Sequence, residues 1–499
     1  MRAGAGRAML NGMGVHRWPK LAVRPGELPF NLLFVLWLLT PCVSFAAVSL
    51  DGLLAELKLI QHRNQTPAFA VVIAAHDGPL HVGAYGVADL ATQKPVSDDT
   101  IFRIGSITKT ITALTTLKAI EKGCLGLNDA FSEHADSDLI DNPWRQRHKV
   151  TIAELLEHTA GLKDLSHHEM YHNDPTPMPL SQAIRQFASN RSVHWYPGEH
   201  YSYSNAGAGL VAYAVGEACG ETFENFATRE VLRPLGMHSA GWRLDSLTRT
   251  HLAVGYDTDK RTPIPYWHML FRPFGGLNVR PQDMSGLLMA LINRGHSNGR
   301  QVFEPDSIRR METPMTSLAA RAGLMTGYGL GIYSWFSNGH RFFGHGGDGD
   351  GYLAHFGYSL TAKTGYFVVI NAFTHTSLGE MRDALEAFIA ARSPVSEVST
   401  GSKADRPALP EEALGAYVHA TTRFGNLPPD PDTAITLSRS GHDLLVSYAS
   451  GSTEELLSAG DNRWRRAGDP DACAALATDH QGRWTFFIDR VSYLRGIRD

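Results

Sequence analysis

Cysteine is scarce in this chain, with four residues among 499. Cys42 lies in an apolar stretch near the N-terminus, and the others are Cys124, Cys219 and Cys473. The three cysteines outside that stretch are odd in number and widely spaced, which predicts neither a disulfide framework nor a C-x-x-C metal site. We therefore interpret these three residues as small side chains of the core.

The chain also lacks an excess of positive charge and any repeat or low-complexity segment. Its formal net charge is −4, and without residues 1–46 it would be −8, because that segment carries five basic residues and one acidic residue. An acidic chain has no electrostatic reason to bind nucleic acid. The length predicts two or three domains, and a hydrophobic content of 43% is ample for a core.

Long hydrophobic runs are absent except at the N-terminus. Five basic residues among the first 27 precede an apolar stretch over 30–48, which Pro41 interrupts. The Ser44-Phe-Ala46 run fits a small-x-small cleavage site, so we predict residues 1–46 to be a signal peptide and the remainder to be secreted or periplasmic. The alternative is an uncleaved membrane anchor.

The stretch around Ser106 carries the clearest chemical signal. Apolar residues recur at helical spacing over 107–117, which indicates an amphipathic helix that ends near Gly123. Residues three apart share a helix face, so Ser106 and Lys109 meet near the N-terminal end, where free N–H groups favour negative charge. Burial would push the lysine toward its neutral, basic form. This spacing predicts a nucleophile beside a base.

Two later motifs complete an ordered set with S-x-x-K. They are the Y-x-N run Tyr203-Ser-Asn205 and the H-x-G run that begins at His345. In this order the three motifs resemble the serine β-lactamase and penicillin-binding family, specifically the class C β-lactamase-like hydrolases. The likeness covers roughly residues 50–392 and extends to flanking runs at 158–162, 196–198, 233–237 and 275–277.

The resemblance implies a role for each motif residue. Ser106 would attack a carbonyl group and form an acyl-enzyme, while Tyr203 and Lys109 share the transfer of its proton. Asn205 would position Lys109 and the substrate amide. His345 would face the substrate from a strand edge.

The resemblance also implies an oxyanion hole. It would consist of the backbone N–H groups of Ser106 and Asp348, a pair of donors worth about 3 kcal/mol of barrier. Gly346 and Gly347 would let the backbone and the ligand approach closely. No cofactor and no metal are expected, and the expected partner is a small-molecule or peptide substrate.

The order of elements predicts the architecture. A helix, two early strands, a long helical region and four late strands suggest an α+β fold of the β-lactamase/transpeptidase type, in which an antiparallel sheet is flanked by helices and carries a helical subdomain. We assign this domain to 47–392, a linker to 393–410 and a small β-rich C-terminal domain to 411–499. No catalytic constellation is visible in the C-terminal domain.

Three sequence runs imitate functional motifs. Lys363-Thr-Gly365 spells K-T-G but lies between two apolar runs, where a turn is expected. The Y-x-N run 171–173 lies in a loop. The run from His168 to His172 spells the zinc-peptidase motif H-E-x-x-H, yet prolines that would break a helix follow at once.

The sequence thus predicts an exported serine hydrolase that cleaves small amides or esters. His345 stands where many relatives carry a lysine that captures a carboxylate, and H-x-G resembles D-amino-acid peptidases and some esterases. A β-lactamase or D,D-carboxypeptidase is the alternative within the family. A zinc hydrolase and a non-catalytic cell-wall-peptide binding protein are alternatives from other classes.

Overall fold

The computed structural model describes residues 49–172, 176, 178–394, 409–423, 431–441 and 443–496. The predicted signal peptide and most of the predicted linker lie outside these residues. No helix in the described ranges is both long and apolar enough to span a membrane.

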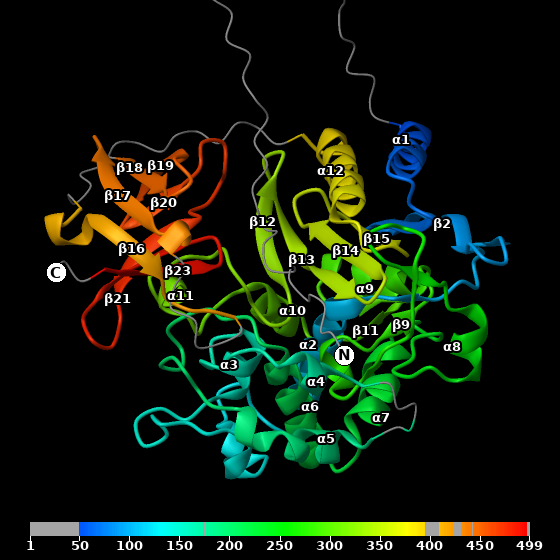
Figure 1. Cartoon of the computed structure of the whole chain (residues 1–499), viewed down its shortest axis with the longest axis horizontal. Coiled ribbons are helices and arrows are strands. Elements are labelled where there is room, and N and C mark those ends of the chain that lie inside the picture. Colours follow the sequence, from blue (N-terminus) through cyan, green and yellow to red (C-terminus); the bar gives the residue numbers. More distant parts are fainter. Residues whose placement is uncertain are drawn as a thin grey trace, which may run out of the picture. The chain divides into compact units, whose positions relative to one another are not determined.

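A seven-stranded antiparallel sheet forms the centre of the larger domain (Figure 1). Its spatial order is β12-β13-β14-β15-β1-β2-β3, so the first strands lie beside the last ones. The strands are β1 (Ala68–Ala75), β2 (Gly78–Asp89), β3 (Lys94–Pro95), β12 (Tyr333–Ser337), β13 (His340–Gly349), β14 (Tyr352–Ser359) and β15 (Thr364–Ile370). This arrangement confirms the predicted sheet.

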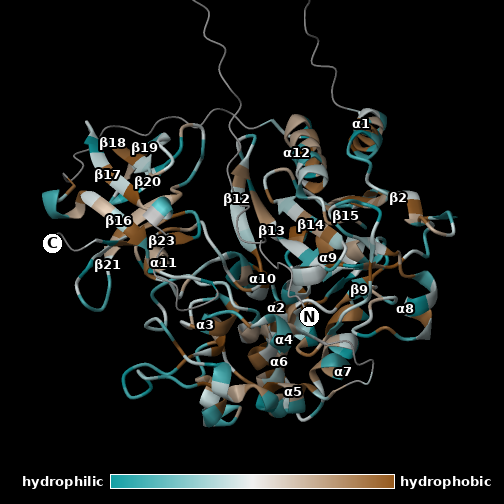
Figure 2. Cartoon of the chain, in the orientation of Figure 1, coloured by the Kyte–Doolittle hydropathy of each residue, from teal (hydrophilic) through white to brown (hydrophobic). Residues whose placement is uncertain are grey.

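The two faces of the sheet bury different hydrophobic clusters because side chains alternate along each strand. Val71 and Ile73 of β1 pack with residues of α1 (Leu50–Arg63) and α12 (His375–Arg392). Ala70 and Val72 belong to the larger cluster with α2 (Thr108–Glu121), α6 (Asn205–Cys219) and α9 (Asp283–Ile292). Figure 2 shows hydrophobic and hydrophilic positions along α12, as expected for a helix with one face on a sheet.

Short elements make up the helical subdomain and its connections. The helices are α3 (Ile152–Leu156), α4 (His167–Met170), α5 (Leu180–Gln186), α7 (Phe223–Ala227), α8 (Ser246–His251), α10 (Pro305–Glu312) and α11 (Leu318–Arg321). Two-residue strands form four small two-stranded sheets. They pair β4 (Phe102–Arg103) with β9 (Asn278–Val279), β5 (Tyr171–His172) with β8 (His268–Met269), β6 (Gly255–Tyr256) with β7 (Pro263–Ile264) and β10 (His296–Ser297) with β11 (Arg300–Gln301).

Helix α2 is buried nearly all round, so the prediction of an amphipathic helix is wrong. Its five threonines are buried, and each hydroxyl group donates to a carbonyl oxygen of the preceding turn or of a neighbouring segment. Thr110 Oγ1 donates to Gly331 O (2.9 Å) and Thr112 Oγ1 to Pro273 O (2.7 Å). Threonine can therefore line a buried helix without an unsatisfied hydroxyl. The predicted end of the helix is confirmed, since Gly123 follows it with φ 76°.

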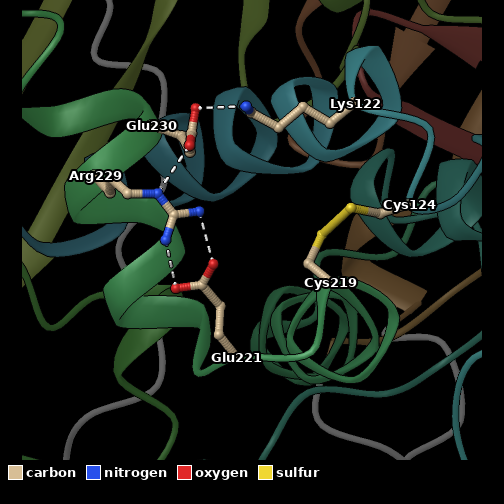
Figure 3. The surroundings of a disulfide bond; sticks show 6 residues. All are labelled: Lys122, Cys124, Cys219, Glu221, Arg229 and Glu230. Carbon is tan, nitrogen blue, oxygen red and sulfur yellow. Dashed lines mark hydrogen bonds and ion pairs between the residues drawn. A yellow bond between two sulfur atoms is a disulfide. The ribbon is translucent and has the colours of Figure 1, made fainter.

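Cys124 and Cys219 form a disulfide, which contradicts the interpretation of these two residues as free core side chains. They follow α2 and end α6, and their Cα atoms lie 5.4 Å apart although 95 positions separate them in sequence. Figure 3 shows ion pairs beside the bond, in which Arg229 binds Glu221 and Glu230. Sequence spacing alone could not reveal that two helix ends meet. Cys473 is a buried free thiol, as predicted.

The C-terminal domain is a closed eight-stranded barrel. Its strands are β16 (Gly415–His419), β17 (Ile435–Ser440), β18 (Asp443–Tyr448), β19 (Thr453–Gly460), β20 (Arg463–Arg465), β21 (Ala474–Thr478), β22 (Trp484–Ile488) and β23 (Val491–Arg495). The barrel has its own hydrophobic core, which includes Tyr417, Leu444 and Phe486. The sequence prediction of a small β-rich domain is correct.

Candidate active site

Ser106 lies in a tight turn, η1 (Gly105–Ile107), that leads into α2. The turn fits closely against β13 because glycine occupies both contacting positions. Gly105 has φ 51°, and a Cβ on Gly347 would lie 1.9 Å from Ile104 O. Any larger residue at 347 would push the strand away from the nucleophile.

Lys109 stands one turn after Ser106 with its side chain 2% exposed. Its Nζ lies 3.0 Å from Ser106 Oγ, 2.6 Å from Asn205 Oδ1 and 2.8 Å from Phe274 O. Burial holds the pKa of Lys109 well below its ordinary value of 10.5, and the nearby Asp164 carboxylate offsets this only in part. A neutral amine has two N–H groups and one lone pair. In the neutral form the two carbonyl oxygens can accept both hydrogens, which leaves the lone pair to face the serine hydroxyl.

Asn205 is held in one orientation by Asp164. Asp164 Oδ1 accepts from the Asn205 backbone N–H (2.6 Å), and Oδ2 accepts from Asn205 Nδ2 (3.1 Å). Because the carboxylate can only accept, the amide nitrogen must face Asp164 and the amide oxygen must face Lys109. The first residue of α6 thereby fixes the lysine.

Tyr203 lies beside the lysine, with Lys109 Nζ 4.9 Å from the centroid of its ring. Burial raises the pKa of Tyr203 well above its ordinary value of 10.0, although its hydrogen bond with Ser106 acts in the opposite direction. The phenol is therefore neutral over the physiological range. The ring of His158 packs 4.3 Å from that of Tyr203, and His158 Nδ1 accepts from the backbone N–H of Ser204 (3.2 Å).

His345 is buried on β13, where its exposed fraction is 3%. Nδ1 donates to the carbonyl oxygen of Gly346, so Nε2 accepts the hydrogen bond from the Tyr328 hydroxyl at 2.7 Å. Burial lowers the pKa of His345 to about 3. The imidazole is neutral near pH 7 and supplies no positive charge to a ligand.

The structure thus brings Ser106, Lys109, Asn205, Tyr203 and His345 into one cluster. The centroids of the Tyr203 and His345 rings are 6.3 Å apart. Gly346, Gly347 and Asp348 continue β13 past His345, and Asp348 N lies 2.7 Å from the position that a Cβ on Gly105 would take. The two predicted oxyanion donors therefore come from adjacent backbone segments.

The three runs that imitate functional motifs do not form the sites that they spell, although Met170 Sδ in one of them accepts from Asn205 Nδ2 at 3.5 Å. Lys363 adopts φ 48° in the turn between β14 and β15, as predicted. Asn173 lies outside the described residues. Helix α4 ends at Met170, so His168 and His172 do not share a helix, and Glu169 instead accepts hydrogen bonds from the N–H (2.8 Å) and hydroxyl (2.7 Å) of Ser166.

Several residues of the cluster carry no signal in the sequence. They are Asp164, Phe274, Tyr328 and the barrel residue Arg423. Arg423 Nε donates to Asp164 Oδ2 at 2.8 Å, and its guanidinium carbon lies 4.8 Å from the centroid of the Tyr203 ring. Asp164 and Phe274 adjoin the runs 158–162 and 275–277, and that proximity is the one available hint. Nothing in the sequence points to Arg423.

Comparison with known proteins places this architecture among the β-lactamase/transpeptidase-like folds. The penicillin-binding protein homologue from Pyrococcus abyssi, described as octameric, superimposes with a TM-score of 0.59 at 19% identity, covering 89% of this chain and 99% of the other. SurE with D-Leu gives a TM-score of 0.58 at 18% identity over 89% and 99%.

The family described as Beta-lactamase matches residues 57–391, and the chain belongs to this family of serine hydrolases. A β-lactamase from Yersinia enterocolitica is 26% identical over 54% of this chain and 65% of its own length. Protein flp from Staphylococcus aureus (strain N315) is 25% identical over 47% of this chain and 48% of its own. The chain thus spans less than two thirds of either relative.

Proposed function

We propose that the protein is an exported serine hydrolase that forms an acyl-enzyme on Ser106 and cleaves amides or esters of D-amino acids or similar small acyl groups. The observation that carries the proposal is the environment of Lys109. Its two hydrogen-bond acceptors, Asn205 Oδ1 and Phe274 O, leave the lone pair of a neutral amine directed at Ser106 Oγ.

Acylation then follows from these positions. Ser106 Oγ bonds to the substrate carbonyl carbon while its proton passes to Lys109 Nζ, and the charge that develops on the carbonyl oxygen is held by the backbone N–H groups of Ser106 and Asp348. When the tetrahedral intermediate collapses, the neutral phenol of Tyr203 donates a proton to the departing amine or alkoxide and regains one from Lys109. Water then attacks the acyl carbon while Lys109 takes its proton, and Lys109 returns that proton to Ser106 Oγ as the Oγ–acyl bond breaks and the acid is released.

The neutral His345 argues against a preference for β-lactams. A lysine at this position would offer a charge to the substrate carboxylate, whereas the buried imidazole is committed to Tyr328 and Gly346. The fold neighbour SurE is described with D-Leu. Both points support a D-amino-acid amide or ester over a β-lactam.

Export is supported by the disulfide between Cys124 and Cys219, because such bonds persist in oxidising compartments. Expression of the full chain with a C-terminal tag tests it. Recovery of a protein that begins near residue 47 from the periplasm or medium is expected, and an intact N-terminus in the cytoplasm would overturn the assignment.

A substrate panel tests the proposed activity. Wild type and Ser106→Ala are compared on D- and L-aminoacyl p-nitroanilides, short p-nitrophenyl esters and nitrocefin. Hydrolysis of D-substrates or esters that Ser106→Ala lacks is expected. Faster hydrolysis of nitrocefin would instead assign a β-lactamase, and binding of D-peptides without turnover would assign a binding protein.

A further inference from the structure

The barrel contributes a residue to the polar network behind the nucleophile. The segment 421–423 follows β16 and binds the larger domain at two adjoining loops. Thr421 Oγ1 donates to Tyr201 O (3.1 Å), and the Asp164 N–H donates to Arg423 O (2.8 Å). These backbone contacts bring the Arg423 side chain to the Asp164 carboxylate.

We infer that Arg423 is a positioning residue, which reaches from the barrel to hold Asp164, and through it Asn205, in the arrangement that keeps Lys109 available as the base for Ser106. The inference rests on the proposed function, because it assigns Arg423 to the same nucleophile. The chain of contacts runs from Arg423 Nε to Asp164 (2.8 Å), from Asp164 to Asn205 Nδ2 (3.1 Å) and from Asn205 Oδ1 to Lys109 Nζ (2.6 Å).

Charge balance explains why this arginine matters. The Asp164 side chain is fully buried, and among the described residues its one ion pair is with Arg423. A buried carboxylate needs a compensating cation. Without Arg423, the Asp164 carboxylate would favour the protonated form of Lys109, which cannot accept the serine proton.

The charges around Lys109 shift its pKa in opposite directions. Asp164 and Asp348 favour the protonated lysine, whereas Arg423 disfavours it. The barrel residue Arg490 adds a positive charge that acts on His158 and His345, and the other titratable groups that face the cluster are neutral, namely His158, His345, Tyr201, Tyr203 and Tyr328. Loss of the Arg423 charge should therefore raise the pKa of Lys109 and move the acid limb of Ser106 acylation to higher pH.

The test measures the rate constant for labelling of the full chain by a fluorophosphonate, which carries no carboxylate for an arginine to bind. Arg423→Gln should slow labelling at pH 7 by about tenfold, the value of one charged hydrogen bond, and shift the acid limb upward. Arg423→Lys keeps the charge and should retain the wild-type acid limb. An unshifted acid limb in Arg423→Gln would overturn the inference.

A matched control separates positioning from attachment of the barrel. Arg463 is also a barrel arginine that donates to the larger domain, at Gly323 O (3.1 Å), but it contacts none of the network. Arg463→Gln should label at the wild-type rate. If it slows labelling as much as Arg423→Gln does, the effect belongs to general docking of the barrel.

A double-mutant cycle decides whether Arg423 acts through Asp164. In the Asp164→Asn background, Arg423→Gln should change the labelling rate by less than about twofold, since the residue through which it acts is gone. Equal losses in both backgrounds would overturn the inference. If Arg423→Gln fails to fold, as a loss of thermal stability would show, Arg423→Met, which also removes the charge, takes its place in the cycle. Failure of wild type itself to be labelled would instead refute the proposed function.

Discussion

At the scale of single residues, the site depends on burial that keeps ionisable side chains neutral. Burial keeps the pKa of His345 at about 3, compared with its ordinary 6.5. Between these values the unfolded chain binds a proton at this imidazole and the folded chain does not, so acidification favours unfolding. His158 and His355 contribute in the same direction, because burial also holds their pKa values well below 6.5.

We predict that the free energy of unfolding falls as the pH drops from 7 to 5, with His345 alone contributing about 2 kcal/mol of the loss. Urea unfolding at several pH values measures it. His345→Gln, which can still pair with Tyr328 and Gly346, should flatten the dependence by that amount. His76→Gln is the control, because the His76 side chain is 55% exposed and its replacement removes no buried imidazole. Equal slopes for wild type and His345→Gln would contradict the assignment.

At the scale of elements, the site requires β13 to lie close against the turn that carries Ser106. We predict that Gly347→Ala abolishes labelling of Ser106 and destabilises the fold, because the added Cβ would meet Ile104 O. Gly379→Ala on α12 is the matched control, since nothing lies within 4 Å of its added Cβ. It should label normally and gain up to about 1 kcal/mol from helix propensity. Normal labelling of Gly347→Ala would disprove the close approach.

The disulfide also links elements, because it joins the ends of the two helices that carry Lys109 and Asn205. We predict that Cys124→Ser/Cys219→Ser loses about 4 kcal/mol of unfolding free energy, as expected for a loop of this length. Denaturant titrations with and without a reductant measure it. The reductant should destabilise wild type alone, and an equal response of the double variant would argue against the bond.

The sequence could predict those elements whose signals are local. Short apolar runs indicated the sheet strands, and three spaced motifs gave Ser106, Lys109, Tyr203 and His345 as candidates. It could not predict that α2 is buried. A threonine hydroxyl can bind water or a buried carbonyl group, and only the packed fold shows which of the two it binds. The pairing of Cys124 with Cys219 likewise depends on where two helices end in space.

At the scale of the whole molecule, the barrel joins the larger domain at several places besides Arg423. His480 donates from its backbone N–H to Glu199 Oε1 (2.6 Å), and its Nδ1 lies 2.9 Å from Oε2 of the same residue. Thr326 Oγ1 donates to Ala472 O (2.9 Å). Such contacts between distant segments have no sequence signature, which explains why the C-terminal domain showed no link to the site.

The whole account depends on an activated Ser106, and the most direct measurement is intact mass after treatment with a fluorophosphonate, followed by peptide mapping. Wild type should gain one adduct, located on Ser106. Ser106→Ala should gain none, and Lys109→Arg, whose guanidinium stays protonated, should react at least about 100-fold more slowly, a loss at the low end of the usual contribution of a general base. A folded wild type that gains no adduct, or one located on another serine, would contradict the account.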